Sequence, residues 1–66
     1  MEKISTNQAK IIAQLHILEP GCMAGDPRLE QGKYIVPVVY DGQAVGFICI
    51  HAQSGKVIGG AGGGPM

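Results

Sequence analysis

The sequence predicts an α+β domain in which an N-terminal helix packs on a small antiparallel β-hairpin or sheet. A helix-start motif stands at Ser5, and an apolar periodic segment follows it. Two runs rich in Val, Ile and aromatic residues then flank Asp41-Gly42, the strongest short-range signal for a β-hairpin. A chain of 66 residues accommodates one small domain.

The first predicted element is a helix over about Thr6 to Ile17. Ser5 and Gln8 fit a capping box, in which each side chain accepts a backbone N–H of the other residue. The Glu19-Pro20-Gly21 sequence ends the helix. Its apolar arc is wider than that of an ordinary surface helix, so we expect it to touch more than one surface. At about 100° per residue, one apolar stripe holds Ala9, Ile12, Ala13 and Ile17, and a second holds Ile11, Leu15 and Leu18.

Residues 19–33 read as a connecting loop, because prolines and glycines interrupt any period. The connection is long for so small a domain. Two interpretations remain open. Either Arg28-Leu29-Glu30 forms a short turn or edge strand, which we favour, or the loop itself is functional.

The predicted hairpin occupies residues 34–50. A two-residue turn at Asp41-Gly42 pairs Tyr40 with Gln43 and thereby sets the register. Pro37 cannot donate to a ladder, so its nitrogen must face an edge or a bulge, and this register puts Gly46 across from it. Both faces come out apolar, unlike those of a half-solvated sheet. One holds Tyr34, Val36, Val38, Val45, Phe47 and Cys49; the other holds Ile35, Pro37, Val39, Ala44, Gly46, Ile48 and Ile50.

The end of the chain is predicted to leave the domain after Ile58. A second turn spans residues 52–56, where Gly55 is free to take a positive φ, and Val57-Ile58 pair briefly. The glycines that follow are costly to order without contacts. The sequence therefore predicts a domain over residues 1–58 and a flexible Gly-rich tail over residues 59–66.

Charge and composition limit the classes of function that the chain can have. Five basic and five acidic residues balance without runs, which argues against a nucleic-acid partner. The N-terminal segment lacks the apolar core of a signal peptide, and no segment approaches about 20 apolar residues. We expect a cytoplasmic protein without a membrane span. Cys22 and Cys49 are expected as free thiols, with a disulfide between loop and hairpin as the alternative.

No catalytic set is evident in the sequence. The hydroxyl of Ser5 is explained by its cap and that of Ser54 by its turn, and no nucleophile stands beside an evident base. The sequence predicts a non-enzyme without a cofactor or a metal. The alternative function is a metal- or redox-responsive protein, although the spacings match no zinc pattern. Its residues would be His16, Cys22, Cys49 and His51.

The two apolar hairpin faces carry the functional prediction, because one short helix covers only one of them. A bare face would expose a patch on the order of several hundred Å², the size that marks interaction sites. A loop or tail folded over it is the alternative. We expect a protein partner, with a homodimer as the first expectation. The contact surface is Tyr34, Val36, Val38, Val45 and Phe47, or the opposite face Ile35, Val39, Ile48 and Ile50.

Two segments together resemble the PepSY domain, a small module found in propeptides of some metallopeptidases and in assorted bacterial and archaeal proteins. Residues 4–13, I-S-T-N-Q-A-K-I-I-A, look like its opening helix, "I-S-x-x-x-A-x-x-I-A". Residues 34–58 are similar to its closing hairpin, "Y-x-V-x-V … D-G … V-D-A-x-T-G-K-V", with His51 in place of Asp and Ser54 in place of Thr. The resemblance implies a helix packed on a small antiparallel sheet, a binding or inhibitory role toward a peptidase, and no catalytic residues.

Overall fold

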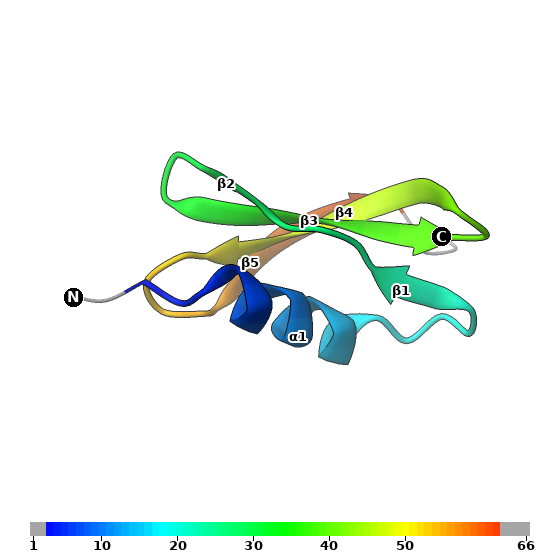
Figure 1. The fold of residues 1–66 in the computed structure, drawn as a ribbon, viewed down its shortest axis with the longest axis horizontal. Coiled ribbons are helices and arrows are strands. Elements are labelled where there is room, and N and C mark those ends of the chain that lie inside the picture. The colour runs from blue at the N-terminus through cyan, green and yellow to red at the C-terminus, as the bar shows by residue number, and fades with distance from the viewer. Residues whose placement is uncertain (1–2, 63–66) are drawn as a thin grey trace.

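The computed structural model describes residues 3–62 and has one helix packed on a five-stranded antiparallel sheet. The sheet order is β1-β3-β4-β5, and β2 also pairs with β3, so that β1 and β2 follow one another along the same edge of β3. Figure 1 shows the helix on one side of the sheet. The predicted α+β class is confirmed. The elements are α1 (Thr6–His16), β1 (Cys22–Ala24), β2 (Arg28–Glu30), β3 (Lys33–Tyr40), β4 (Gln43–His51) and β5 (Val57–Gly62).

Helix α1 begins at the predicted capping box. Ser5 Oγ accepts the N–H of Gln8 at 3.0 Å, and Gln8 Oε1 accepts the N–H of Ser5 at 2.7 Å. At the other end, the backbone of Ile17 is extended and its N–H donates to the Gln14 carbonyl oxygen at 3.2 Å. The helix therefore ends one residue before the predicted end.

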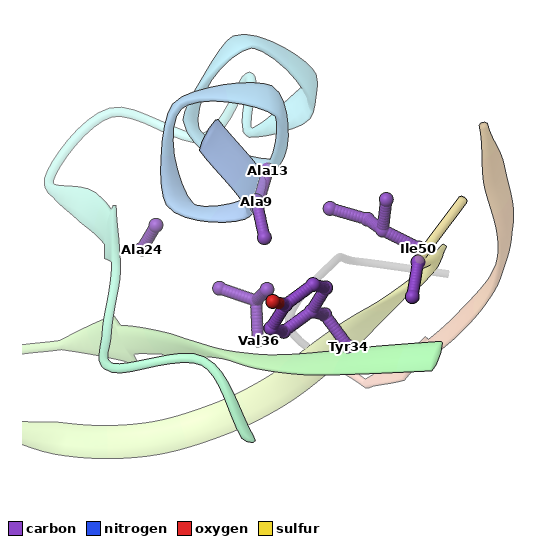
Figure 2. Packing of buried hydrophobic residues seen from close by; sticks show 7 residues of the cluster. Ala9, Ala13, Ala24, Tyr34, Val36 and Ile50 are labelled. Carbon is purple, nitrogen blue, oxygen red and sulfur yellow. The ribbon is translucent and has the colours of Figure 1, made fainter. Parts of the chain in front are cut away.

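The core lies between α1 and one face of the sheet. Ala9 and Ala13 are fully buried, and their small side chains let the helix approach the strands closely. Figure 2 shows these alanines directed toward Val36 and Tyr34. The largest fully buried side chains are only Val36 and Ile50, so the core is small. It consists of Ala9, Ala13, Ala24, Tyr34, Val36, Ile50 and Ala52.

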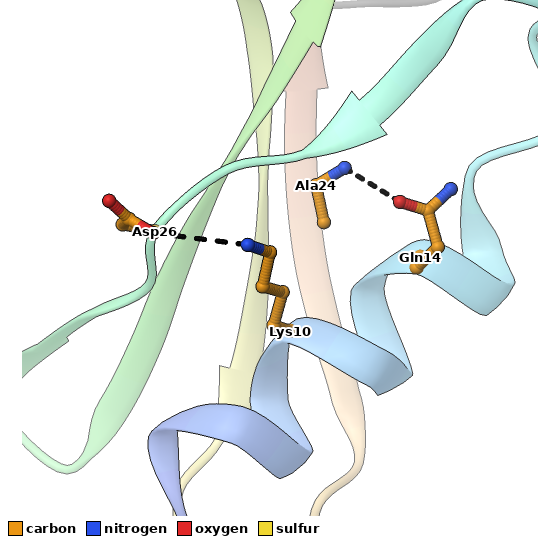
Figure 3. A network of polar contacts seen from close by, with 4 residues as sticks. All are labelled: Lys10, Gln14, Ala24 and Asp26. Carbon is orange, nitrogen blue, oxygen red and sulfur yellow. Dashed lines mark hydrogen bonds and ion pairs between the residues drawn. The ribbon is translucent and has the colours of Figure 1, made fainter.

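Strand β1 is held to the helix by a polar contact. The N–H of Ala24 donates to Gln14 Oε1 at 2.9 Å, and Figure 3 shows this bond beside the Lys10–Asp26 ion pair. The ion pair joins exposed side chains at 3.9 Å and contributes little. The Gln14 bond satisfies a backbone donor of an edge strand and so blocks that position to another chain.

Pro37 explains why the edge beside β3 is split into two short strands. In an antiparallel ladder, the N–H and C=O of one residue point to the same neighbouring strand. The Pro37 carbonyl accepts the N–H of Gly25 at 2.7 Å, so the missing donor of Pro37 also faces this edge. A Cβ atom on Gly25 would lie 2.8 Å from Pro37 Cγ. The chain passes the proline at this glycine, leaves the ladder and rejoins it as β2. Of the short turn or edge strand predicted at Arg28–Glu30, the structure has the strand. Strand β1 was not predicted.

The β3–β4 turn has the predicted geometry. Asp41 and Gly42 have φ values of 52° and 78°, and left-handed values at both central positions are typical of a type I′ hairpin turn. Tyr40 pairs with Gln43, as predicted.

Beyond the turn, the predicted register is wrong. Val39 pairs with Ala44 but Val38 pairs with Gly46, which leaves Val45 as an extra residue in a β-bulge. A shift by one residue moves every later side chain of β4 to the other face. Phe47, and not Gly46, therefore lies across from Pro37. Tyr34 and Val36 share their face with Ile50 and Ile48, and not with Phe47 and Cys49.

The sheet continues past the predicted domain end at Ile58. Strand β5 pairs with β4 as far as Gly62, so the glycine run takes part in the ladder through its backbone. Gly60 approaches β4 so closely that a Cβ atom there would lie 2.8 Å from the Phe47 carbonyl oxygen. Residues 63–66 of the predicted tail lie outside the described residues.

Candidate interaction surface

The sheet has an apolar face on the side away from α1, which we call the outer face. Along β3, alternate residues are buried under the helix, and the residues between them are half-buried on the other side. Phe47 and Met23 are the most exposed of the large apolar side chains there, at 42% and 63%. The larger apolar side chains that strand pairing assigns to the outer face are Met23, Ile35, Pro37, Val39, Phe47 and Cys49.

Phe47 lies at the centre of the outer face. It is directly across from Pro37, and the next outward pair along the ladder is Ile35 with Cys49. On the opposite side of β3, Met23 of β1 pairs with Val39. No charged side chain belongs to this apolar centre.

Charged residues lie at one end of the outer face. Glu30 pairs with Lys33 and Arg28 with Ile35, which gives these side chains the outward orientation. Arg28 and Glu30 form an ion pair at 3.4 Å. The outer face thus combines an apolar centre with charges of both signs at one edge, as interfaces with a polar rim do.

The structure divides the predicted contact residues between two environments. Four of them are buried beneath α1 and are not available to a partner, and Ile48 packs against the same core. The bulge residue Val45 lines a shallow depression together with Tyr40 and Cys22, on the helix side. Ile35, Val39 and Phe47 remain on the outer face. The buried four are Tyr34, Val36, Val38 and Ile50.

Sequence reasoning missed Met23 because it did not predict β1. The three residues Cys22–Ala24 follow Pro20-Gly21 and precede Gly25 and Pro27, so local composition signals a loop. Their strand conformation comes from pairing with the end of β3, a contact between distant parts of the chain. The available signal was the apolar run Cys22-Met23-Ala24 between two glycines, which is too short to distinguish a strand from a loop.

The helix carries a second apolar surface, which we call the helix stripe. Ile11, Leu15 and Leu18 are exposed at 53%, 74% and 87%. The stripe of Ala9, Ile12, Ala13 and Ile17 faces the core instead. Within residues 3–62, the helix thus packs by one stripe only, and a second surface for it stays a prediction.

Polar side chains near the end of β4 organise a turn. Ser54 Oγ accepts the N–H of Lys56 at 3.2 Å, and His51 Nδ1 accepts the N–H of Ser54 at 3.3 Å. Gly55 has a φ of 76°, as the predicted turn requires, and its N–H donates to the His51 carbonyl oxygen at 2.9 Å. These contacts explain Ser54 and His51 as turn residues.

The four residues of the metal or redox alternative do not assemble. Cys22 and Cys49 are free thiols, and they pair with Tyr40 and Ile35, at opposite ends of β3 and on opposite faces. His16 Nδ1 donates to the Ile12 carbonyl oxygen at 3.0 Å, within its own helix. In the part of the chain that the structure describes, no three His, Cys, Asp or Glu side chains are grouped to hold a metal ion.

The same described part, residues 3–62, contains no helix that is long and apolar enough to cross a membrane.

Comparison with known proteins gives no relative: no family model, no curated protein and no solved structure matches this chain.

Proposed function

We propose that this chain is a small non-catalytic binding module that associates with itself. The observation that carries the proposal is the one-sided cover of the sheet. Helix α1 packs on one face, while Phe47 and Met23 are exposed on the other, among further apolar side chains. Contiguous apolar patches of this kind mark protein-interaction sites.

The small core gives a physical reason for association. A chain of this size buries only about 60% of the surface that its unfolded form exposes. Its largest fully buried side chains are one Val and one Ile, while Phe47, its single Phe, is 42% exposed. Full burial of a large apolar side chain contributes about 1.5–3 kcal/mol, against a typical total stability of about 5–15 kcal/mol. Covering Phe47 with a partner would therefore matter for the fold as well as for binding.

The absence of catalysis is part of the proposal. Ser5 Oγ, Ser54 Oγ and His51 Nδ1 each accept a backbone N–H in a cap or turn. The two thiols lie on opposite faces of the sheet. These placements favour structural roles for the residues that carry nucleophilic or basic groups.

The resemblance to the PepSY domain suggests a more specific form of this proposal, the restraint of a peptidase. The segments that carry the resemblance form α1 and the β3–β4 hairpin, and the α+β arrangement agrees with what the resemblance implies. This form is tested by adding the purified chain to a metallopeptidase from the same source. Slower peptide hydrolysis would support peptidase restraint, and an unchanged rate of hydrolysis at saturating protein would exclude it.

Self-association is tested by measuring molecular mass in solution over a dilution series. We expect the mass to fall from that of a dimer at high micromolar concentration toward that of one chain on dilution. A mass of one chain throughout the series would overturn the proposal.

A further inference from the structure

We infer that the outer face binds a second copy of this chain. The two sheets then stack face to face about a two-fold axis near Phe47. The inference rests on the proposed function and adds to it the surface and the occupant.

The charge distribution suits a copy of the same surface. A two-fold interface brings identical patches together, so any charge in the centre would meet like charge. The centre of the outer face, around Phe47 and Pro37, contains no charged residue. The charges at its edge, Arg28, Glu30 and Lys33, are of both signs. The outer face is therefore compatible with itself.

The size of the outer face meets the requirement of a specific but weak dimer. The sheet is four strands wide, and β3 is 8 residues long. At about 4.8 Å between strands and about 3.3 Å per residue, its footprint is about 500 Å² per copy, or about 1,000 Å² for two. Specific interfaces begin at about 1,000 Å² in total. Because weak complexes lie at this low end of interface size, we expect a dimer that dissociates in the micromolar range.

The other apolar surfaces of the described chain are narrower. The helix stripe is one row of side chains along a helix of 11 residues, about 16 Å long at 1.5 Å per residue, with Leu18 just beyond the helix end. The edge beside β1 has its Ala24 N–H occupied by Gln14. The β5 edge is rich in glycine, so pairing there would bury little side chain. Of these candidates, the outer face is the broadest, because its apolar side chains come from β1, β3 and β4 together.

Stacking of the two sheets also brings the large side chains at the centre of each outer face into contact. Facing sheets pack about 10 Å apart with interdigitated side chains. Because Phe47 and Pro37 are neighbours across the β3–β4 ladder, a two-fold axis that runs between them along the strands would set Phe47 of each copy against Pro37 of the other. The largest outer-face side chain then fills the centre of the interface, where binding energy concentrates.

The two native cysteines report on this arrangement without substitution. Cys49 belongs to the outer face, whereas Cys22 points to the helix side, and both are half-buried. Modification by a small thiol reagent is followed by mass spectrometry at protein concentrations below and well above the dissociation constant. We expect modification of Cys49 to slow about tenfold at the higher concentration, because only the monomer reacts and its fraction falls by mass action. Cys22 serves as the internal control and should react equally at both.

A pair of matched variants separates this inference from the proposed function. We expect Phe47→Gln to weaken the dimer at least about tenfold in sedimentation, while Leu15→Gln, on the helix stripe, leaves it unchanged. A dimer with reactive Cys49 that only Leu15→Gln disrupts would overturn the outer face and leave self-association standing. A single-chain mass at all concentrations would overturn both. A single-chain mass with Cys49 unreactive throughout would show that the chain covers its own outer face.

Discussion

Phe47 lies directly across from Pro37 in the β3–β4 ladder, on the side of the sheet away from the helix. This relationship depends on the bulge at Val45. If every residue of β4 paired in turn, Val45 included, Phe47 would pair with Val36 and point toward Ala9 and Ala13 in the core. The bulge thus decides whether the only Phe of the chain belongs to the core or to the surface.

Deletion of Val45 is expected to leave the faces of β4 unchanged, whereas deletion of Ile48 is expected to destabilise the protein severely. Without Val45, Phe47 still pairs with Pro37, because only the unpaired extra residue is lost. Without Ile48, Ile50 would shift by one position along β3 and turn away from the core. We expect the free energy of unfolding to fall by roughly 3 kcal/mol or more for the Ile48 deletion, and by much less for the Val45 deletion. Urea unfolding followed by circular dichroism measures both, and equal losses would contradict the assigned register.

Gly25→Ala is expected to disturb the crossing at Pro37. The new Cβ atom would lie 2.8 Å from Pro37 Cγ and 3.2 Å from Val39 Cγ2. We expect a loss of about 1–3 kcal/mol in the free energy of unfolding, as in other cases of overpacking. Gly59→Ala is the matched control, since no heavy atom lies within 4 Å of its Cβ position. If both substitutions cost the same, steric contact at Gly25 is not the cause.

Ile50→Ala tests the small core. Ile50 is fully buried, whereas Ile58 on the neighbouring strand is 50% exposed. We expect a loss of about 2–5 kcal/mol for Ile50→Ala, from lost apolar transfer and the cavity left behind, and much less for Ile58→Ala. Thermal unfolding of the two variants gives the comparison. A larger loss for Ile58→Ala would mean that the core lies elsewhere.

Ser5→Ala removes one half of the capping box. The N–H of Gln8 loses its acceptor at the helix start, and we expect a loss of about 1 kcal/mol. Ser5→Asp supplies another capping oxygen and should retain most of the stability. Denaturant midpoints of the two variants and the wild type measure these differences. An alanine variant as stable as wild type would show that the cap does not stabilise the protein.

The helix and the hairpin turn were predictable because their signals are local. Ser5 and Gln8 are three residues apart, and Asp41-Gly42 form a turn by themselves. The bulge was not predicted. Gly46 beside Val45 was a signal for it, since a Gly inside a strand often marks a bulge, but the slip itself lies only in the pairing of two strands. Strand β5 was predicted only at Val57-Ile58, and its continuation was missed for a related reason: glycines give no side-chain pattern, yet their backbone completes the ladder with β4.

The difference between local signals and strand pairing also explains which residues of the candidate surface were predicted correctly. Alternation in β3 correctly separated Ile35 and Val39 from Tyr34, Val36 and Val38, because the strand is regular over its whole length. The matching residues of β4 were assigned to the wrong faces, since the assignment passed through the bulge. The expectation that a second apolar face exists did not depend on register, because both faces were apolar in either alignment.

Sedimentation equilibrium of the wild-type chain beside Phe47→Gln, from low to high micromolar concentration, tests the stacking of two outer faces most directly. We expect a reversible dimer for wild type and a folded single chain for the variant over the same range. A wild type that never exceeds the mass of one chain, or a variant that associates as strongly as wild type, would contradict it.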